Sequence, residues 1–221
     1  FLGRLIGILF LIPLIYFTFK IKFSKLISLY LIFILICFQG FIGWYMVSSG
    51  LIDRVDVSHF RLSVHLLIAF IILSLIFWNY LKIKVNNNYN NTLGWFLPLT
   101  FLLLIFIQIS IGAFVSGMDA GKIYNSWPLM GNSFFPDDNS YSNLFKISAF
   151  SDPSLVQFIH RNLAYLIGLF YVFILFKVYK NKIIKLYRPV NILGFFIILQ
   201  IVLGIFTVVL GAQIYIAAVH Q

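Results

Sequence analysis

Long hydrophobic runs alternate with short polar stretches along the whole chain. A helix needs roughly 20 apolar residues to cross a hydrocarbon core about 30 Å thick. Six runs are long enough, at residues 2–19, 26–47, 62–81, 93–115, 155–176 and 190–210, and a seventh begins near Gln213. This pattern predicts an all-α, polytopic membrane protein.

Composition supports the same class. Hydrophobic residues make up 62% of the sequence, charged residues make up 10%, and the mean hydropathy is +1.00. One water-soluble core cannot bury that much apolar surface, so the lipid bilayer is the expected partner of most of the surface. Cys37 is the single cysteine, which excludes an internal disulfide and a multi-cysteine metal site.

The charged residues that give the net charge of +10 are unevenly distributed along the chain. Lysine and arginine gather in alternate connections, at residues 20–25, 82–84 and 177–188, whereas the connections around residues 53–56 and 119–152 are neutral or acidic. The positive-inside rule assigns the basic connections to the cytoplasm and the others to the outer side. The basicity therefore predicts topology and not a nucleic-acid partner.

The two ends of the sequence lie inside apolar runs. The sequence begins at Phe1 and stops at Gln221 while another run is starting. We therefore expect a part of a longer protein. For the same reason we expect residues 2–19 to be a spanning helix and not a signal peptide, which needs a basic head and a small-residue cleavage site.

An internal repeat relates the two halves at an offset of 161 residues. The offset places Leu2, Leu5, Ile6 and Gly7 on Leu163, Leu166, Ile167 and Gly168, and it places Gln39 and Gly43 on Gln200 and Gly204. The repeat predicts two pseudo-symmetric four-helix bundles, at residues 1–85 and 86–221, with an outer loop at 116–153. The motif Q-x-x-x-G occurs a third time at Gln108 and Gly112, and by itself it is typical of plain helix packing.

Histidines near the outward ends of the predicted spans are the candidate functional residues. His160 and His220 form one expected pair, and His65 pairs with a position just before Phe1, 161 residues before His160. Histidine in a span needs a polar partner, and two neutral imidazoles from facing helices bind a six-coordinate haem iron. The alternative is that each histidine hydrogen-bonds across its bundle.

Two arginines accompany these histidines. Arg61 lies four residues before His65 and therefore on the same helix face, and Arg161 is next to His160. Both are expected at the outer boundary, where haem propionates need cations. His59 belongs to no pair, and we expect it to have an interfacial cap or loop role.

Four segments together resemble the haem A synthase family over essentially the whole chain. They are "GWYMVSSGLIDRVDVSHFRLSVHLLIAF" (43–70), "GAFVSGMDAGKIYNSWPLM" (112–130), "VQFIHRNLAYLIG" (156–168) and "LQIVLGIFTVVLGAQIYIAAVHQ" (199–221). The D-A-G-x-x-Y-N-x-W-P-L-M stretch is the most specific. Without paired cysteines in its outer loops, the chain is similar to the proteobacterial and mitochondrial type.

The resemblance implies an eight-helix protein that oxidises a methyl group of haem O to a formyl group through hydroxylations, giving haem A for cytochrome oxidase. It implies haem b as cofactor, with its iron held by His160 and His220, and haem O as substrate, with His65 as one ligand. The family also has a glutamate and a histidine in an E-x-x-x-H-R motif. This sequence contains no glutamate, so these catalytic residues are expected before Phe1 and the chain alone is expected to be inactive.

Further partners and the location also follow from the resemblance. Expected partners are haem O synthase, cytochrome oxidase assembly factors, an electron-transfer partner and a second copy of the chain. The expected location is the bacterial inner membrane with the haem sites toward the periplasm, or alternatively the mitochondrial inner membrane. Two other functions stay open, a di-haem b-type electron-transfer cytochrome and a repeat-built transporter.

The long outer loop is expected to be functional, because loops of this length usually are. Trp127, Phe134 and Phe135 are expected either at the membrane surface or over a haem edge. Asp119, Tyr124 and Asn125 fall on the family signature, and the sequence assigns no chemical step to them.

Overall fold

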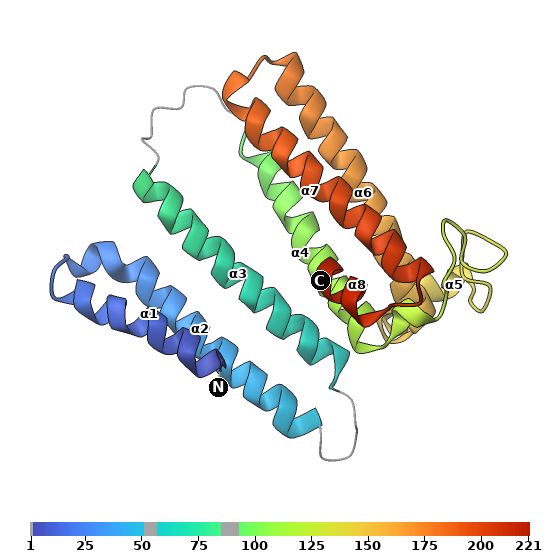
Figure 1. The fold of residues 1–221 in the computed structure, drawn as a ribbon, viewed down its shortest axis with the longest axis horizontal. Helices are drawn as coiled ribbons and strands as arrows, with labels where there is room; N and C mark the ends of the chain where they lie inside the picture. Colours follow the sequence, from blue (N-terminus) through green and yellow to red (C-terminus); the bar gives the residue numbers. More distant parts are fainter. Residues whose placement is uncertain (1, 51–56, 85–92) are drawn as a thin grey trace. The chain divides into compact units, whose positions relative to one another are not determined.

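The computed structural model describes residues 2–50, 57–84 and 93–221, and within these ranges it contains helices, connecting loops and one isolated β-bridge between Met130 and Ser133. The predicted all-α class is confirmed (Figure 1). The chain divides into two compact units, residues 1–88 and 89–221. The boundary predicted between residues 85 and 86 and the charged residues Asp53, Arg54 and Asp56 lie outside the described residues.

The first unit contains three helices, α1 (Leu2–Thr18), α2 (Phe23–Gly50) and α3 (His59–Lys84). Helix α2 packs against both α1 and α3. The start of α2 is joined to the end of α3 by a hydrogen bond of 2.7 Å that the Ser28 hydroxyl donates to the Asn79 side-chain oxygen. The hydrophobic effect does not drive helices together in lipid, so hydrogen bonds of this kind contribute to their association.

The second unit is built from α4 (Phe96–Gly117), α6 (Pro153–Lys180), α7 (Ile184–Val209) and the short α8 (Ile214–His220). Helix α6 packs against α4 and α7, and α8 packs against α7 (Figure 1). At the core of the unit, the Tyr171 hydroxyl donates to the main-chain oxygen of Val190 at 3.2 Å. Gly194 is required there, because a Cβ atom at this position would overlap the Tyr171 ring.

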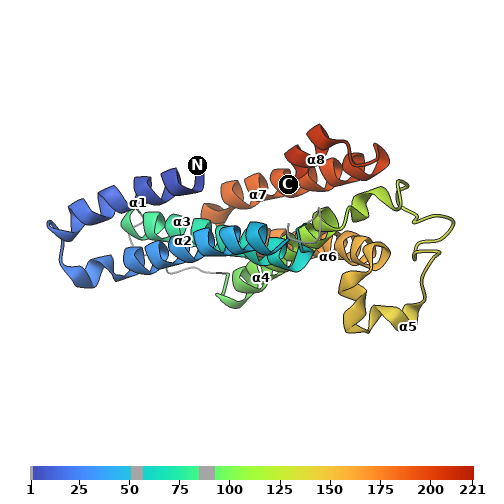
Figure 2. The same ribbon diagram turned by 90° about the horizontal axis from the view of Figure 1, so that it is seen from below.

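An outer loop of the second unit joins α4 to α6 and extends beyond the ends of these helices (Figure 2). It contains two 3₁₀ turns, η1 (Ala120–Lys122) and η2 (Ile147–Ser151), and the one-turn helix α5 (Tyr141–Leu144). The loop residues Phe135 and Ala149 form a small core with Leu155 at the start of α6. The N-terminus of helix α6 is capped by Asp152, whose side chain accepts a 3.0 Å hydrogen bond from the Leu155 main-chain N–H.

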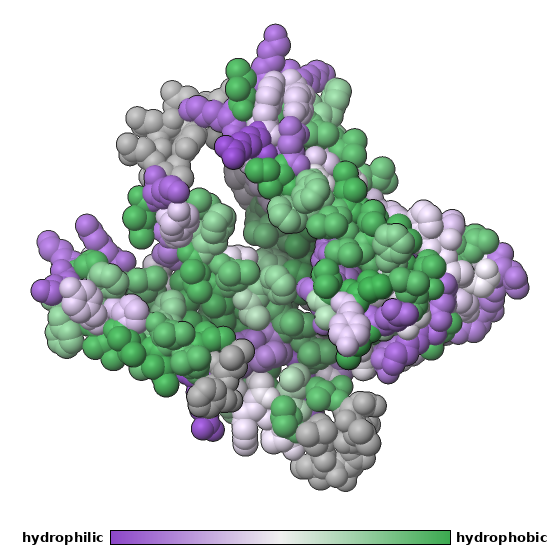
Figure 3. Space-filling model, viewed as in Figure 1, coloured by the Kyte–Doolittle hydropathy of each residue, from purple (hydrophilic) through white to green (hydrophobic). Residues whose placement is uncertain are grey.

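Five helices of the described residues are long and apolar enough to cross a membrane, judged by length and composition. They are α2, α3, α4, α6 and α7, and α1 is apolar but shorter. Figure 3 shows hydrophobic residues along the helices, with hydrophilic residues mostly at the connections. Large apolar side chains on these helices face outward, such as Leu169 at 70% and Phe195 at 64% exposure. The protein is therefore a polytopic membrane protein.

Candidate functional site

His160 and His220 come together in the second unit. His160 lies on α6 and His220 at the end of α8, and their ring centres are 6.3 Å apart with the two ring planes nearly perpendicular, at 88°. The two residues are 60 positions apart in sequence and on different helices. The predicted pairing of these two histidines in space is therefore present.

Each of the three candidate histidines is held by a glutamine on a neighbouring helix. The glutamine side-chain amide donates to the main-chain oxygen of the histidine in all three cases. The N···O distances are 2.9 Å from Gln39 to His65, 3.2 Å from Gln108 to His160, and 2.7 Å from Gln200 to His220. In the first two cases the same amide nitrogen also lies 3.2 Å and 3.3 Å from the histidine Nε2 atom.

A glycine one helical turn after each glutamine lies against the imidazole ring. A Cβ atom at these glycines would approach the ring Cε1 atom more closely than ordinary packing allows. The distances would be 3.0 Å from Gly43 to His65, 3.2 Å from Gly112 to His160, and 2.9 Å from Gly204 to His220. We call each glutamine and glycine pair, with the histidine that it holds, a histidine cradle.

The cradles refine the interpretation of the Q-x-x-x-G motif. The sequence favoured plain helix packing, in which glutamine bonds across helices and glycine lets two backbones approach. The glutamines do bond across helices, from α2 to α3, from α4 to α6 and from α7 to α8. The glycines, however, leave room for an imidazole ring. The motif therefore marks the histidine positions, which spacing alone did not reveal.

The three rings each contain a buried nitrogen without a partner. The Nδ1 atoms of His65, His160 and His220 have no hydrogen-bond acceptor or donor in the part of the chain that the structure describes. Leaving a buried polar atom unpaired costs about 1–3 kcal/mol. Hydrogen bonding across the bundle, the alternative from the sequence, therefore accounts for only part of the polar capacity of these rings.

The described part of the second unit has few side chains that could coordinate a metal ion. Among the described residues, no three histidine, cysteine, aspartate or glutamate side chains gather closely enough to hold an ion. His160 and His220 are close together and would offer two histidine nitrogens to a metal. A group bound there has to bring the remaining ligands itself.

Comparison with known proteins shows which family the chain is similar to. The family model described as "Cytochrome oxidase assembly protein" matches residues 1–221. The chain is 48% identical over 222 residues to a protein named heme A synthase from Pelagibacter ubique (strain HTCC1062), covering all of this chain and 66% of that protein. It is 38% identical to the heme A synthase of Rickettsia bellii (strain RML369-C) and 39% identical to that of Rickettsia felis (strain ATCC VR-1525 / URRWXCal2), covering all of this chain and 67% of each.

This chain belongs to the haem A synthase family. The resemblance predicted from its motifs is thereby confirmed. The chain spans about two thirds of the length of these relatives. No solved structure matches it.

Arg161, beside one of the cradles of this family member, is buried, and its guanidinium binds the outer loop. The guanidinium donates to the main-chain oxygens of Tyr124 and Ser126 at 2.9 Å each, and to that of Leu129 at 3.4 Å. Arg61 in the first unit lies over the ring of Tyr45, 4.8 Å from its centre. The contacts of both arginines with haem propionates stay predictions.

The family signature in the outer loop is held by a second set of hydrogen bonds. The Tyr124 hydroxyl donates to Asp138 at 2.9 Å, the Ser154 hydroxyl donates to the other oxygen of Asp138 at 2.6 Å, and the Gln157 amide donates to the Tyr124 main-chain oxygen at 3.0 Å. Partial burial and the nearby Asp138 raise the pKa of the Tyr124 phenol. Partial burial alone would raise the pKa of Asp138, but the hydrogen bonds from Ser154 and Tyr124 bring it below its ordinary value.

The remaining loop residues have varied positions. Asp119 forms an exposed ion pair of 3.0 Å with Lys122. The Trp127 indole nitrogen donates to the Tyr165 hydroxyl at 2.9 Å, which ties the loop to α6. The predicted position of Phe135 at the membrane surface is wrong, because this ring is only 6% exposed and packs against Ala149 and Leu155, whereas the alternative position over a haem edge stays a prediction. No pattern in the sequence indicated the roles of Gln157 and Asp138.

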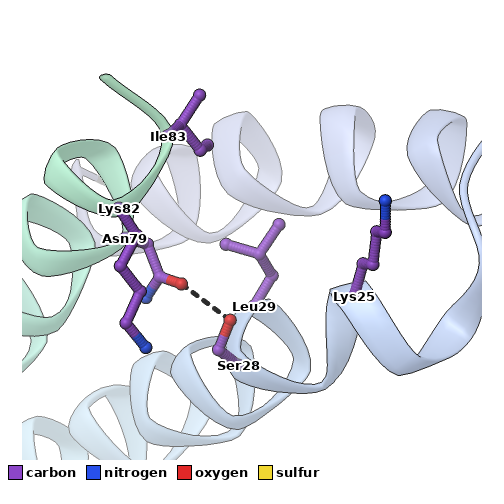
Figure 4. A pocket seen from close by; sticks show the side chains of 6 residues that line it. All are labelled: Lys25, Ser28, Leu29, Asn79, Lys82 and Ile83. Carbon is purple, nitrogen blue, oxygen red and sulfur yellow. Dashed lines mark hydrogen bonds between the residues drawn. The ribbon is translucent and has the colours of Figure 1, made fainter. Parts of the chain in front are cut away.

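A shallow recess of about 320 Å³ lies at the other end of the first unit (Figure 4). It is lined by Lys25, Ser28, Leu29, Asn79, Lys82 and Ile83. Asn79 is 14 residues from His65 along α3, which corresponds to about 21 Å of helix. The recess is therefore separate from the cradle of His65.

Proposed function

We propose that the protein is a haem A synthase, an oxidoreductase that converts a methyl group of haem O to a formyl group and so gives haem A for cytochrome oxidase. The single observation that carries this proposal is the facing pair of His160 and His220, in a chain of this family. With water as the oxygen source, the conversion releases four electrons and four protons, so an electron acceptor is a necessary partner.

The pair of histidines fits the iron of haem b. A metal–imidazole bond is about 2 Å long, as in zinc sites, and each ring centre lies about 1 Å beyond its nitrogen, so two imidazoles that would both hold one metal ion would have ring centres up to about 6 Å apart. The observed separation of 6.3 Å agrees with this value. The unpaired ring nitrogens also favour a ligand at this place. Haem b, when bound, supplies one-electron redox chemistry.

The first unit is proposed to bind haem O as substrate. His65 is held by the same kind of cradle as the two haem b ligands, with its ring against Gly43 and its carbonyl bound by Gln39. The shared geometry supports a shared role, in which His65 would hold the iron of the substrate haem. The chain's own contribution is to orient the bound haem and to keep it among apolar helices, away from bulk water.

The proposed location is the bacterial inner membrane, with both haem sites near the periplasmic side. The basic connections support this orientation through the positive-inside rule, and the relatives named above are bacterial. Haem O synthase, cytochrome oxidase assembly factors and an electron-transfer protein are proposed partners, as is a second copy of the chain. The mitochondrial inner membrane is the alternative location.

The direct test is to express the protein at its natural length in a bacterial strain that lacks its own synthase, and to identify the extracted haems by chromatography and mass analysis. We expect haem A in the cells and haem b bound to the purified protein. Haem b without haem A would instead indicate a di-haem electron-transfer cytochrome, and the absence of haem would favour a transporter. Residues 1–221 expressed alone should give no haem A.

A further inference from the structure

The histidine cradle occurs three times, in both units. It holds His65 in the first unit and both histidines of the second unit, with the same order of glutamine, three residues and glycine. Plain helix packing requires neither that the glutamine bind a histidine carbonyl nor that the glycine face an imidazole. The repetition therefore points to a requirement that all three histidines share.

The glutamine sets how far the helix that carries the histidine is shifted along the helix that carries the glutamine. A main-chain oxygen has two lone pairs, so the carbonyl of a helical histidine accepts one bond from its own helix and a second from outside. Gln108 makes this second bond to His160 at 3.2 Å, and the Gln200 amide binds the carbonyl of His220, the last residue of α8, at 2.7 Å. Because the bond goes to the main chain, it sets the position of the helix, and the Nδ1 atom of each ring stays without a partner among the described residues.

The glycine fixes the sideways position of the ring. At Gly204 an added Cβ would lie 2.9 Å from the His220 Cε1 atom, and something would have to shift. At Gly112 the distance to His160 would be 3.2 Å, so a smaller displacement is enough. The imidazole lies directly against the helix that carries the glutamine, so a single methyl group there would displace the ring from this position.

We propose that Gln39, Gln108 and Gln200 are positioning residues for the axial histidines, and that Gly43, Gly112 and Gly204 set the distance of each ring from the iron. This inference rests on the proposed function, because it assigns a haem iron to these histidines. Partners that orient metal ligands typically change metal affinity or activity by about 10- to 100-fold when they are removed. In the second unit, two cradles together set the separation of the His160 and His220 rings.

The test uses the protein at its natural length, purified with its haem b, and reads the low-spin electron paramagnetic resonance signal and the haem b content. The variants are Gly204→Ala and Gly112→Ala. The matched control is Gly168→Ala, a helical glycine of the same unit whose added Cβ would meet only Ile201, at an ordinary distance of 3.7 Å. We expect a shifted signal and about 10-fold weaker haem retention in Gly204→Ala, a smaller effect in Gly112→Ala, and no change in the control.

A second set of variants removes the hydrogen bond without adding bulk. Gln108→Met and Gln200→Met keep the side-chain length and lose the amide donor. Asn162→Leu is the control, because the Asn162 amide donates only within its own helix, to the Phe158 main-chain oxygen at 2.9 Å. We expect the two methionine variants to shift the low-spin signal while the amount of folded protein, measured by size-exclusion chromatography, stays the same.

The outcomes separate this inference from the proposed function. A wild-type protein without a bis-histidine haem b signal would overturn the proposed function and this inference with it. A normal wild-type signal that is unchanged in Gly204→Ala and in both methionine variants would overturn the cradle alone. A Gly204→Ala protein that fails to fold leaves the decision to the methionine variants.

Discussion

The guanidinium of Arg161 donates a 2.9 Å hydrogen bond to the main-chain oxygen of Tyr124, which joins the residue next to His160 to the outer loop 37 positions away. Two more loop carbonyls, of Ser126 and Leu129, accept from the same side chain. The arginine is 9% exposed, so little water replaces these bonds if they are lost. The loop that carries the family signature is therefore anchored directly beside a proposed haem ligand.

Replacing Arg161 by lysine should loosen this loop. An ammonium group cannot reproduce the planar fork that reaches several carbonyls at once, and hydrogen bonds to a charged group contribute about 1.5–3 kcal/mol each. We expect faster hydrogen exchange of the main chain at residues 124–129, measured by mass spectrometry. Lys122→Gln is the control, because its exposed ion pair with Asp119 contributes little. Equal exchange in both variants would show that Arg161 does not anchor the loop.

The carboxyl group of Asp138 should make the loop sensitive to acid. Its pKa in the folded protein is lowered, so its contribution to stability is present above the ordinary carboxyl range and is lost as the pH falls through the folded value. Protonation weakens the bonds from Ser154 and Tyr124. We expect hydrogen exchange at residues 124–138, corrected for its intrinsic pH dependence, to be steady from about pH 7 to 5 and to rise below about pH 4.

The variant Asp138→Asn is the control for this acid response. It keeps the size of the side chain and removes the titrating group. Its exchange should be faster than that of the wild type at neutral pH and should rise less than that of the wild type below about pH 4. An acid response of the same size in both proteins would assign the effect to another group.

The topology predicted from the charges has a simple reporter test. A periplasmic reporter enzyme fused after Lys182, in the basic connection between α6 and α7, should be inactive, and one fused after Asp138, in the outer loop, should be active. The reverse pattern would place the histidines near the cytoplasmic side and contradict the proposed location.

The spans and the histidine pair could be predicted from the sequence for a physical reason. Lipid requires about 20 apolar residues in each crossing helix, and this signal is local, so five predicted spans match helices α2, α3, α4, α6 and α7. The internal repeat predicts that the histidines form one pair in each half, and both His160 and His220 lie near the outward ends of their predicted spans. Because spanning helices are otherwise apolar, a histidine within one is easy to recognise as a candidate functional residue.

The features that the sequence did not predict depend on contacts between distant residues. Arg161 was expected to contact haem propionates, and its hydrogen bonds to the outer loop were not predicted. The loop carbonyls that it binds are 32 to 37 positions away in the sequence. Phe135 looked like one more aromatic residue of an interfacial loop, and its burial against Ala149 and Leu155 depends on how that loop folds. The residues around each cradle glycine in the sequence did not indicate which side chain would lie beside it in the structure.

The central claim is that His160 and His220 are the two axial ligands of haem b. The most direct measurement is the low-spin electron paramagnetic resonance spectrum of the natural-length protein with His160→Ala or His220→Ala, compared with that of His59→Ala. The His59 ring lies at the start of α3, with its centre 4.2 Å from that of the Phe60 ring. We expect either substitution in the pair to abolish the bis-histidine haem b signal and His59→Ala to retain it. An unchanged bis-histidine signal in either paired variant would contradict the account.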